Sequence, residues 1–329
     1  MSRSRPSLRW LLSVLLLLLA APAMAAEAGF EQRTIGDGVE IGIWYPAAGT
    51  PVRQQIGLAA QAVVAGAALP AGPHPLVVMS HGNGGSFAGH LDTAVALAKA
   101  GYIVAALTHP GDNWRDSTRA AALQERPPAL SRLITYMLGE WPGHAAVDPA
   151  RIGAFGFSSG GFTVLAAAGG RPDLKRVASH CAKHPGASPC LLRDHSPPPE
   201  GAWPALPDPR IRAIVAAAPA LGFTFSRAGL AAVTLPVQLW RADADRVLPP
   251  PDSADGVRAA LPRPPEFHAV PGAGHFDFLA PCVDPARAPM LCTSMPGFDR
   301  ARFHVAFNAA VVRFFDRTLK PLASRPPRR

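Results

Sequence analysis

The sequence predicts an α/β fold with a mostly parallel central sheet flanked by helices. Short apolar runs, typical of buried parallel strands, alternate with longer segments whose apolar residues recur at helical spacing. Strands that are joined through a helix pair in parallel, so this alternation places helices on both faces of one sheet. A length of 329 residues suffices for one large domain.

The predicted elements follow one another along the chain. Residues 30–35 and 39–46 are predicted to form a hairpin around a turn at Asp37-Gly38. Residues 47–73, rich in Ala, Gly and Pro, are predicted to be a surface excursion. The buried strands that we expect next cover residues 76–80, 102–108, 152–157, 211–217, 237–240 and 266–270. The predicted helices cover residues 86–100, a segment that begins at Pro127, and residues 159–168 and 300–319.

One interval breaks this alternation. Residues 171–209 contain three consecutive prolines at 197–199 and show little periodicity. Because they follow the helix over 159–168, we expect them to form a cap-like insertion in the domain.

The four cysteines form two local pairs. Cys181 lies close in sequence to Cys190, and Cys282 lies close to Cys292, so we expect two local disulfides if the protein is exported. Neither pair has the Cys-x-x-Cys spacing of a structural zinc site, and we expect no metal.

The N-terminal segment has the pattern of a signal peptide. Three arginines precede an apolar run over residues 11–19, and Ala23-Met24-Ala25 offers the small residues that a signal peptidase needs. The run is too short to span a bilayer, which takes about 20 residues, so we expect no stable membrane insertion. The sequence therefore predicts a cleaved signal peptide over 1–25, a domain over 26–329 with a flexible tail at 320–329, and a periplasmic or secreted protein.

The charge is positive but scattered. The formal net charge is +9, and removal of residues 1–25 leaves 29 Lys and Arg against 23 acidic residues. No basic run is interleaved with aromatic residues, so we expect no nucleic-acid partner.

A candidate nucleophile lies between a predicted strand and a predicted helix. Residues 156–160, Gly-Phe-Ser-Ser-Gly, match G-x-S-x-G in the strand–turn–helix context that this motif requires. The sharp turn leaves no room for side chains two residues either side of Ser158, and it presents the hydroxyl at a helix N-terminus, where negative charge is favoured.

A serine nucleophile needs a base and an acid that orients the base. His275 follows the last predicted strand, at the sheet edge where the serine lies. Asp245 and Asp243 both follow the preceding strand; we prefer Asp245, which is farther out on the loop, and Asp243 remains the alternative.

An oxyanion formed at this serine needs two backbone donors. Ser159 supplies one, and the glycine-rich loop after the first buried strand supplies the other, with Asn83 preferred over Gly84. This loop lacks the third glycine of a dinucleotide-binding motif, because Phe87 stands there. In the same region, His81 is predicted to fix its loop, and His109 either lines the cleft or forms a structural turn.

At these residues the sequence resembles the α/β-hydrolase superfamily, and most of all the bacterial predicted dienelactone hydrolases, which are similar to platelet-activating-factor acetylhydrolases. The resemblance spans about residues 30 to 319 and implies ester hydrolysis without a cofactor. True dienelactone hydrolases use a cysteine nucleophile, whereas this chain has Ser158. The matching segments are residues 44–46, 80–85, 109–111, 148–152, 156–161, Asp245 and 274–275.

The predicted function is therefore a serine hydrolase that cleaves small-molecule carboxylic esters through an acyl-enzyme intermediate. A serine peptidase of the same fold is one alternative, although such enzymes usually carry a large extra domain. A non-catalytic binding protein is the other, and the intact triad argues against it. The sequence leaves the natural substrate, the acyl-chain length and the oligomeric state open.

Overall fold

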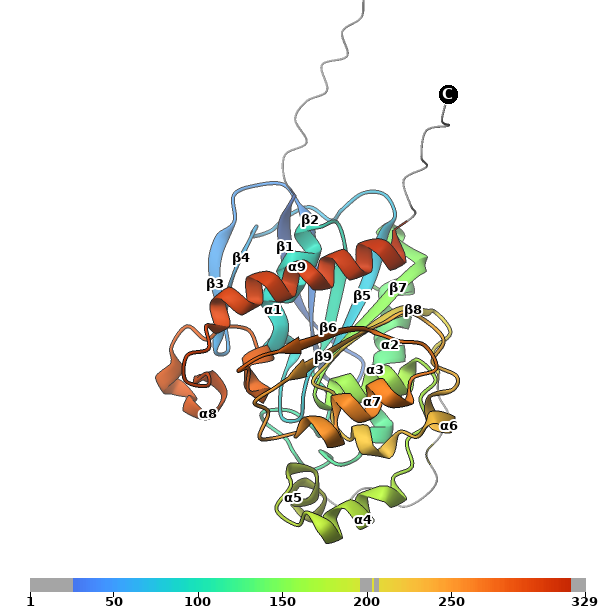
Figure 1. Ribbon diagram of the computed structural model, residues 1–329. Helices are drawn as coiled ribbons and strands as arrows, with labels where there is room; N and C mark the ends of the chain where they lie inside the picture. The colour runs from blue at the N-terminus through green and yellow to red at the C-terminus, as the bar shows by residue number, and fades with distance from the viewer. Residues whose placement is uncertain (1–25, 196–202, 204–206, 321–329) are drawn as a thin grey trace, which may run out of the picture.

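The computed structural model describes residues 26–195, 203 and 207–320 (Figure 1). The predicted signal peptide lies outside these residues, as do most of the predicted tail and residues 196–202 and 204–206 of the insertion. Lys320, the first residue of the predicted tail, is held in place, because its ammonium lies 2.7 Å from Asp316 Oδ1 and donates to the carbonyl of Ala100.

The central sheet has eight strands in the order β1-β2-β6-β5-β7-β8-β9-β10. The six strands from β6 to β10 in this order are parallel, and β2 pairs antiparallel with both β1 and β6. The prediction of a mostly parallel sheet is confirmed. The strands are β1 (Glu27–Ile35), β2 (Val39–Ala47), β5 (His74–Ser80), β6 (Ile103–Leu107), β7 (Val147–Phe157), β8 (Ile211–Ala217), β9 (Val237–Ala242) and β10 (Glu266–Val270).

Helices cover both faces of this sheet (Figure 1). One face packs against α1 (Leu91–Lys99) and α9 (Arg300–Leu319), and the other against α2 (Arg126–Gly139), α3 (Ser159–Ala167) and α7 (Ala254–Ala260). A hydrophobic core lies on each face of the sheet, and alternate residues of β5 pack into one or the other. Leu76 and Val78 belong to the core on the side of α2 and α3, and Val77 belongs to the core on the side of α1. Burial on both sides explains why the central strands are apolar without interruption.

The remaining helices are short. They are α4 (Lys175–Lys183), α5 (Ser188–His195), α6 (Arg227–Leu230) and α8 (Pro289–Cys292), with single turns η1 (Phe87–His90), η2 (Leu123–Glu125), η3 (His144–Ala146), η4 (Gly222–Thr224), η5 (Pro250–Asp252), η6 (His275–Phe278) and η7 (Pro285–Arg287). The predicted helix over 86–100 is thus a turn, η1, followed by α1, because Ser86 caps η1 through Ala88 N–H and a new helix begins at Leu91.

Residues 47–73, predicted only as a surface excursion, contain regular structure that the prediction did not include. This segment contains a two-stranded antiparallel sheet of β3 (Val52–Ile56) and β4 (Ala59–Val63), joined at Gly57, whose φ is +61°. Four of the five β3 side chains are exposed, so β3 carries no apolar run that would mark a strand.

The insertion over 171–209 contains two short helices, α4 and α5, at the lower end of the molecule in Figure 1. The predicted disulfide Cys181–Cys190 joins them, with both sulfurs buried. The second predicted disulfide, Cys282–Cys292, closes the loop between β10 and α9.

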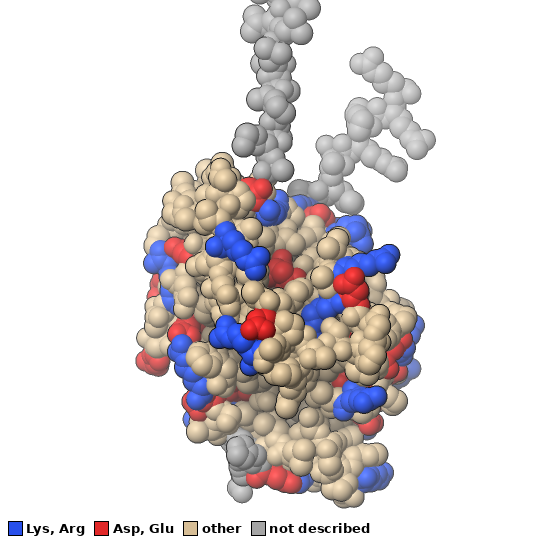
Figure 2. All heavy atoms as spheres, turned by 90° about the vertical axis from the view of Figure 1, so that its left-hand side faces the viewer, with Lys and Arg blue, Asp and Glu red and all other residues tan. Residues whose placement is uncertain are grey.

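The surface carries mixed charge. On the face shown in Figure 2, Lys and Arg side chains are interspersed with Asp and Glu side chains. In the described part of the chain, no helix is long and apolar enough to cross a membrane.

Candidate active site

The three predicted residues Ser158, Asp245 and His275 meet at the carboxyl edge of the sheet. They follow β7, β9 and β10, whose carboxyl ends lie side by side because these strands are parallel. His275 Nδ1 donates to Asp245 Oδ2 over 2.7 Å, and His275 Nε2 lies 3.0 Å from Ser158 Oγ, from which it accepts. Each side chain is nearly buried, so water competes little for these hydrogen bonds.

The backbone around Ser158 is strained in the way that the motif predicts. Ser158 has φ +57° and ψ −119°, a conformation that non-glycine residues rarely adopt. A Cβ atom at Gly156 would lie 2.0 Å from the carbonyl oxygen of Gly160, and one at Gly160 would lie 1.9 Å from that of Ser80. The two glycines are therefore required by close backbone approach on both sides of the serine.

The acid next to the imidazole is Asp245 and not Asp243. The Oδ1 atom of Asp245 accepts from the N–H groups of Val247 and Leu248, at 2.9 and 2.7 Å, which leaves Oδ2 for the imidazole. Asp243 lies nearer the surface and accepts from Arg241 Nε over 2.8 Å.

Asn83 and Ser159 line the same cleft as Ser158, and their backbone N–H groups are candidates for the oxyanion donors. Ser159 is the first residue of α3, so its N–H is not used by the helix. Within the described residues the N–H of Asn83 donates to no protein acceptor, whereas that of Gly84 donates to Asp112 Oδ1 over 2.9 Å. The geometry thus favours Asn83 over Gly84 as the second donor.

Ser158, Ser159, Asn83 and His275 line a cleft of about 450 Å³. Most of its lining is apolar, as in small-molecule sites, and the insertion contributes one wall through α4 and α5. Among the described lining residues Arg193 is the one Lys or Arg, and it pairs with the neighbouring Asp194. The apolar lining residues are Ala121, Leu123, Phe157, Leu174, Val177, Ala178, Pro189, Leu192, Ala220, Leu221, Val247, Leu248, Phe276 and Leu291.

Comparison with known proteins places this site in context. No family model matches the chain. Over 136 residues the chain is 34% identical to the protein named "Putative esterase NocK" from Nocardia uniformis subsp. tsuyamanensis, a match that covers 40% of this chain and only 39% of that protein.

The fold has a solved counterpart along nearly its whole length. The structure of a ferulic acid esterase from Streptomyces cinnamoneus superposes with a TM-score of 0.60 at 21% identity, over 93% of this chain and 95% of that one. The chain has the α/β-hydrolase fold. Within the α/β-hydrolase fold, the chain order Ser158, Asp245, His275 is the usual order of nucleophile, acid and base.

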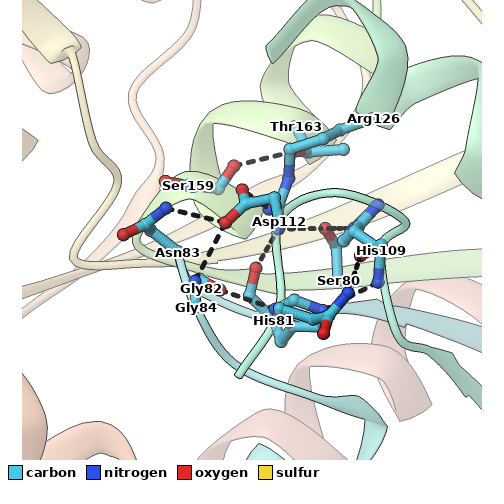
Figure 3. A network of polar contacts seen from close by, with 11 residues as sticks. Ser80, His81, Gly82, Asn83, Gly84, His109, Asp112, Arg126, Ser159 and Thr163 are labelled. Atoms are coloured by element: carbon cyan, nitrogen blue, oxygen red, sulfur yellow. Dashed lines mark hydrogen bonds and ion pairs between the residues drawn. The ribbon is translucent and has the colours of Figure 1, made fainter. Parts of the chain in front are cut away.

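Behind the loop over 81–85 of this α/β-hydrolase domain, sequence reasoning missed a buried ion pair. The Asp112 carboxylate accepts from Asn83 Nδ2 over 2.7 Å and from Gly84 N–H through one oxygen, and pairs with Arg126 through the other (Figure 3). Both charged side chains are 3% exposed. Asp112 therefore fixes the loop that carries Asn83.

Arg126 connects this loop to α3, the helix that follows Ser158. Its guanidinium donates to the carbonyl of His81 and, over 3.1 Å, to Thr163 Oγ1 (Figure 3). The Thr163 hydroxyl in turn donates to the carbonyl of Ser159 over 2.7 Å. The two candidate oxyanion donors thus belong to segments that share one buried polar network.

Two histidines complete the network without facing the cleft. His81 Nδ1 donates to the carbonyl of Gly82 over 2.6 Å, and its Nε2 accepts from the N–H of His109. Burial, reinforced by Arg126, holds the pKa of both imidazoles well below the usual value, so both are neutral. His109 Nε2 lies 2.8 Å from Ser80 Oγ, and His109 is a structural residue of the turn.

The loop that carries His275 has its own support, which the sequence did not reveal. Asp277 Oδ2 accepts from Gly274 N–H over 2.8 Å, and its Oδ1 accepts from Arg300 Nε of α9 over 3.2 Å. The ring of Phe157 packs against His275 with centroids 4.8 Å apart. The loop is therefore fixed through Asp277, and the imidazole itself packs against Phe157.

Proposed function

We propose that this protein is a serine hydrolase that cleaves carboxylic esters through Ser158, Asp245 and His275. The observation that carries the proposal is the line of two hydrogen bonds, 3.0 and 2.7 Å long, that joins hydroxyl, imidazole and carboxylate in a mostly apolar cleft. The choice of an ester is supported by the names of the similar proteins, both of which are called esterases.

In the first half-reaction His275 Nε2 takes the proton of Ser158 while the serine Oγ attacks the ester carbonyl carbon. The N–H groups of Asn83 and Ser159 donate to the oxyanion of the tetrahedral intermediate. Asp245 keeps the Nδ1 proton in place and stabilises the imidazolium. The intermediate collapses, the alkoxide leaves with the proton from His275, and an acyl ester of Ser158 remains.

In the second half-reaction a water molecule attacks the acyl-enzyme. His275 Nε2 takes a proton from this water, and the hydroxide adds to the acyl carbon at the same oxyanion donors. The second intermediate releases the carboxylic acid, and the proton on His275 returns to Ser158. Side chains and backbone supply every group in this cycle, so it needs no cofactor.

The cleft indicates the kind of substrate. Its volume and apolar lining suit a small-molecule ester whose acyl or alcohol part is aliphatic or aromatic. The signal-peptide pattern over 1–25 and the two disulfides support action in the periplasm or outside the cell.

The test is the variant Ser158→Ala with p-nitrophenyl acetate as substrate and a fluorophosphonate probe as label. We expect no turnover and no labelling, with circular dichroism and melting temperature unchanged. Ser117→Ala, at an exposed serine, is the matched control and should keep both the turnover and the labelling of the wild type. Turnover that persists in Ser158→Ala would reject the proposal, and so would a wild-type protein that is neither labelled nor active on esters.

A further inference from the structure

Two histidines on the insertion face an acidic residue on the body of the domain. His180 lies on α4, and His184 is the residue directly after this helix, where its N–H donates to the carbonyl of His180 over 2.9 Å. Asp252 ends the turn η5, which follows β9. One ligand atom from each of these residues lies within 4.8 Å of the other two. The group therefore joins two segments that are far apart in the sequence.

These three side chains are otherwise free to bind a ligand. Within the described residues neither imidazole nor the Asp252 carboxylate takes part in a side-chain hydrogen bond or ion pair with the protein. The contacts of the imidazoles are between rings: His180 and His184 have centroids 4.8 Å apart, and His180 stacks on Phe223 at 4.0 Å. Stacking orients the His180 ring and leaves its nitrogens unused.

The donor set matches a transition metal. His180 and His184 are four residues apart and joined by a backbone hydrogen bond of the helical type, which is the spacing at which two histidines at one face of a helix bind zinc. Two imidazoles and one carboxylate form a ligand set that zinc accepts, with water in the fourth position. Calcium and magnesium, in contrast, prefer oxygen ligands alone.

We propose that His180, His184 and Asp252 form a binding site for a divalent transition-metal ion, for which Zn²⁺ is the best match. Tetrahedral bonds of about 2.1 Å set the ligand atoms about 3.4 Å apart. The ligand atoms, which lie within 4.8 Å of one another, would have to approach by up to about 1.4 Å. Such a shift needs only side-chain rotation, because His184 is exposed and the other two residues are half-buried.

The ion would fasten the insertion to the body beside the cleft. The three residues line a small cavity of about 70 Å³, which shares Leu221, Val247 and Leu248 with the wall of the active-site cleft. Asp252 also lies on the segment that continues from Asp245. Metal binding here is thus a structural function, separate from the proposed ester hydrolysis and independent of its outcome.

The first experiment measures Zn²⁺ binding to the mature, tag-free, disulfide-bonded protein by isothermal titration calorimetry. We expect one ion per chain and a melting temperature that rises with the Zn²⁺ concentration. His184→Ala and Asp252→Asn should each weaken binding about tenfold or more and abolish the rise in melting temperature. His144→Ala, at an exposed histidine elsewhere on the surface, is the control and should bind as the wild type does.

The second experiment tests whether the ion bridges the two segments. Zn²⁺ should slow hydrogen exchange of the α4 amides in the wild type and leave it unchanged in Asp252→Asn. Bound Co²⁺ should show the intense visible bands of a tetrahedral site. Absence of stoichiometric Zn²⁺ binding would overturn the proposal, as would wild-type affinity in either variant or exchange in α4 that does not respond to the ion.

Discussion

Asp112 and Arg126 form an ion pair that is almost completely shielded from water and lies directly behind the loop that carries Asn83. In Asp112→Asn the guanidinium loses its counter-charge, and a buried charge without a partner costs about 3–5 kcal/mol. We expect the free energy of unfolding, measured in urea, to fall by that amount. A loss below about 1 kcal/mol would contradict the assignment of a buried pair.

The same ion pair allows the effect of Asp112 on the rate of ester hydrolysis to be separated from its effect on the stability of the fold. In the double variant Asp112→Leu with Arg126→Met both charges are removed, so part of the lost stability should return. The double variant still lacks the contacts to Asn83 and Gly84. Its kcat for p-nitrophenyl acetate should therefore remain below that of the wild type, while KM changes little. Recovery of kcat together with stability would show that Asp112 has a structural role only.

The close backbone approach at Gly160 predicts a large effect from a single methyl group. In Gly160→Ala the added Cβ meets the Ser80 carbonyl at 1.9 Å, so strand and helix must separate, and we expect a loss of more than about 3 kcal/mol of unfolding free energy. Gly139→Ala in α2 is the matched control, because nothing lies within 4 Å of its new Cβ. That substitution should be neutral or stabilise by up to about 1 kcal/mol.

The two acids after β9 should differ sharply in kinetics. Asp245→Asn removes the group that fixes the His275 tautomer, and in serine hydrolases such a change lowers kcat by about 10⁴-fold. Asp243→Asn breaks only a partly exposed contact to Arg241, and kcat should stay within about twofold of the wild type. Steady-state rates with one ester decide, and the reverse order would exclude Asp245 as the acid.

The buried His90 predicts a dependence of stability on pH. Burial lowers the pKa of His90 from 6.5 to about 4, with Asp92 opposing the shift. Between these values the unfolded chain binds a proton that the folded chain does not, so stability falls as the pH decreases through this window. Within this window, His90 lowers the free energy of unfolding by about 1.4 kcal/mol for each pH unit of decrease.

His90→Phe isolates this contribution, because the ring packs against Phe155 and Phe157 and a phenyl group can take its place without titrating. Urea unfolding at several pH values between 6.5 and 4 should show the wild type losing stability faster than the variant as the pH falls. Parallel curves for the two proteins would show that the buried imidazole does not titrate in this range.

The fold could be predicted from the spacing of apolar residues wherever a helix or strand buries a defined side. The helix over 300–319 and the strands over 211–217 and 266–270 have the predicted bounds, because apolar spacing and flanking breakers both mark them. The sheet of β3 and β4 escaped notice because its first strand is exposed and its second contains several alanines. The insertion helices α4 and α5 were not predicted, because both are short and rich in polar residues, although α4 is amphipathic.

Ser158, His275 and Asp245 could be predicted as a group because each follows a recognisable strand. Asp112 and Arg126 could not, since their pairing depends on the packing of a loop against a helix. One signal was present: Arg126 precedes two prolines that open a helix, and a positive charge there opposes the helix dipole unless an acid lies near. A search for unfavourable charges at helix ends would have singled it out.

Both disulfides link segments that supply side chains to the cleft wall, and neither joins strands of the sheet. Cys181–Cys190 supports the helices that supply Val177 and Leu192, and Cys282–Cys292 closes the loop that supplies Leu291. Ser158, Asp245 and His275 follow strands of the sheet, whereas part of the cleft wall comes from two disulfide-linked segments. Under the proposed function, substitutions in these two segments would change which esters fit the cleft and leave the reacting residues in place.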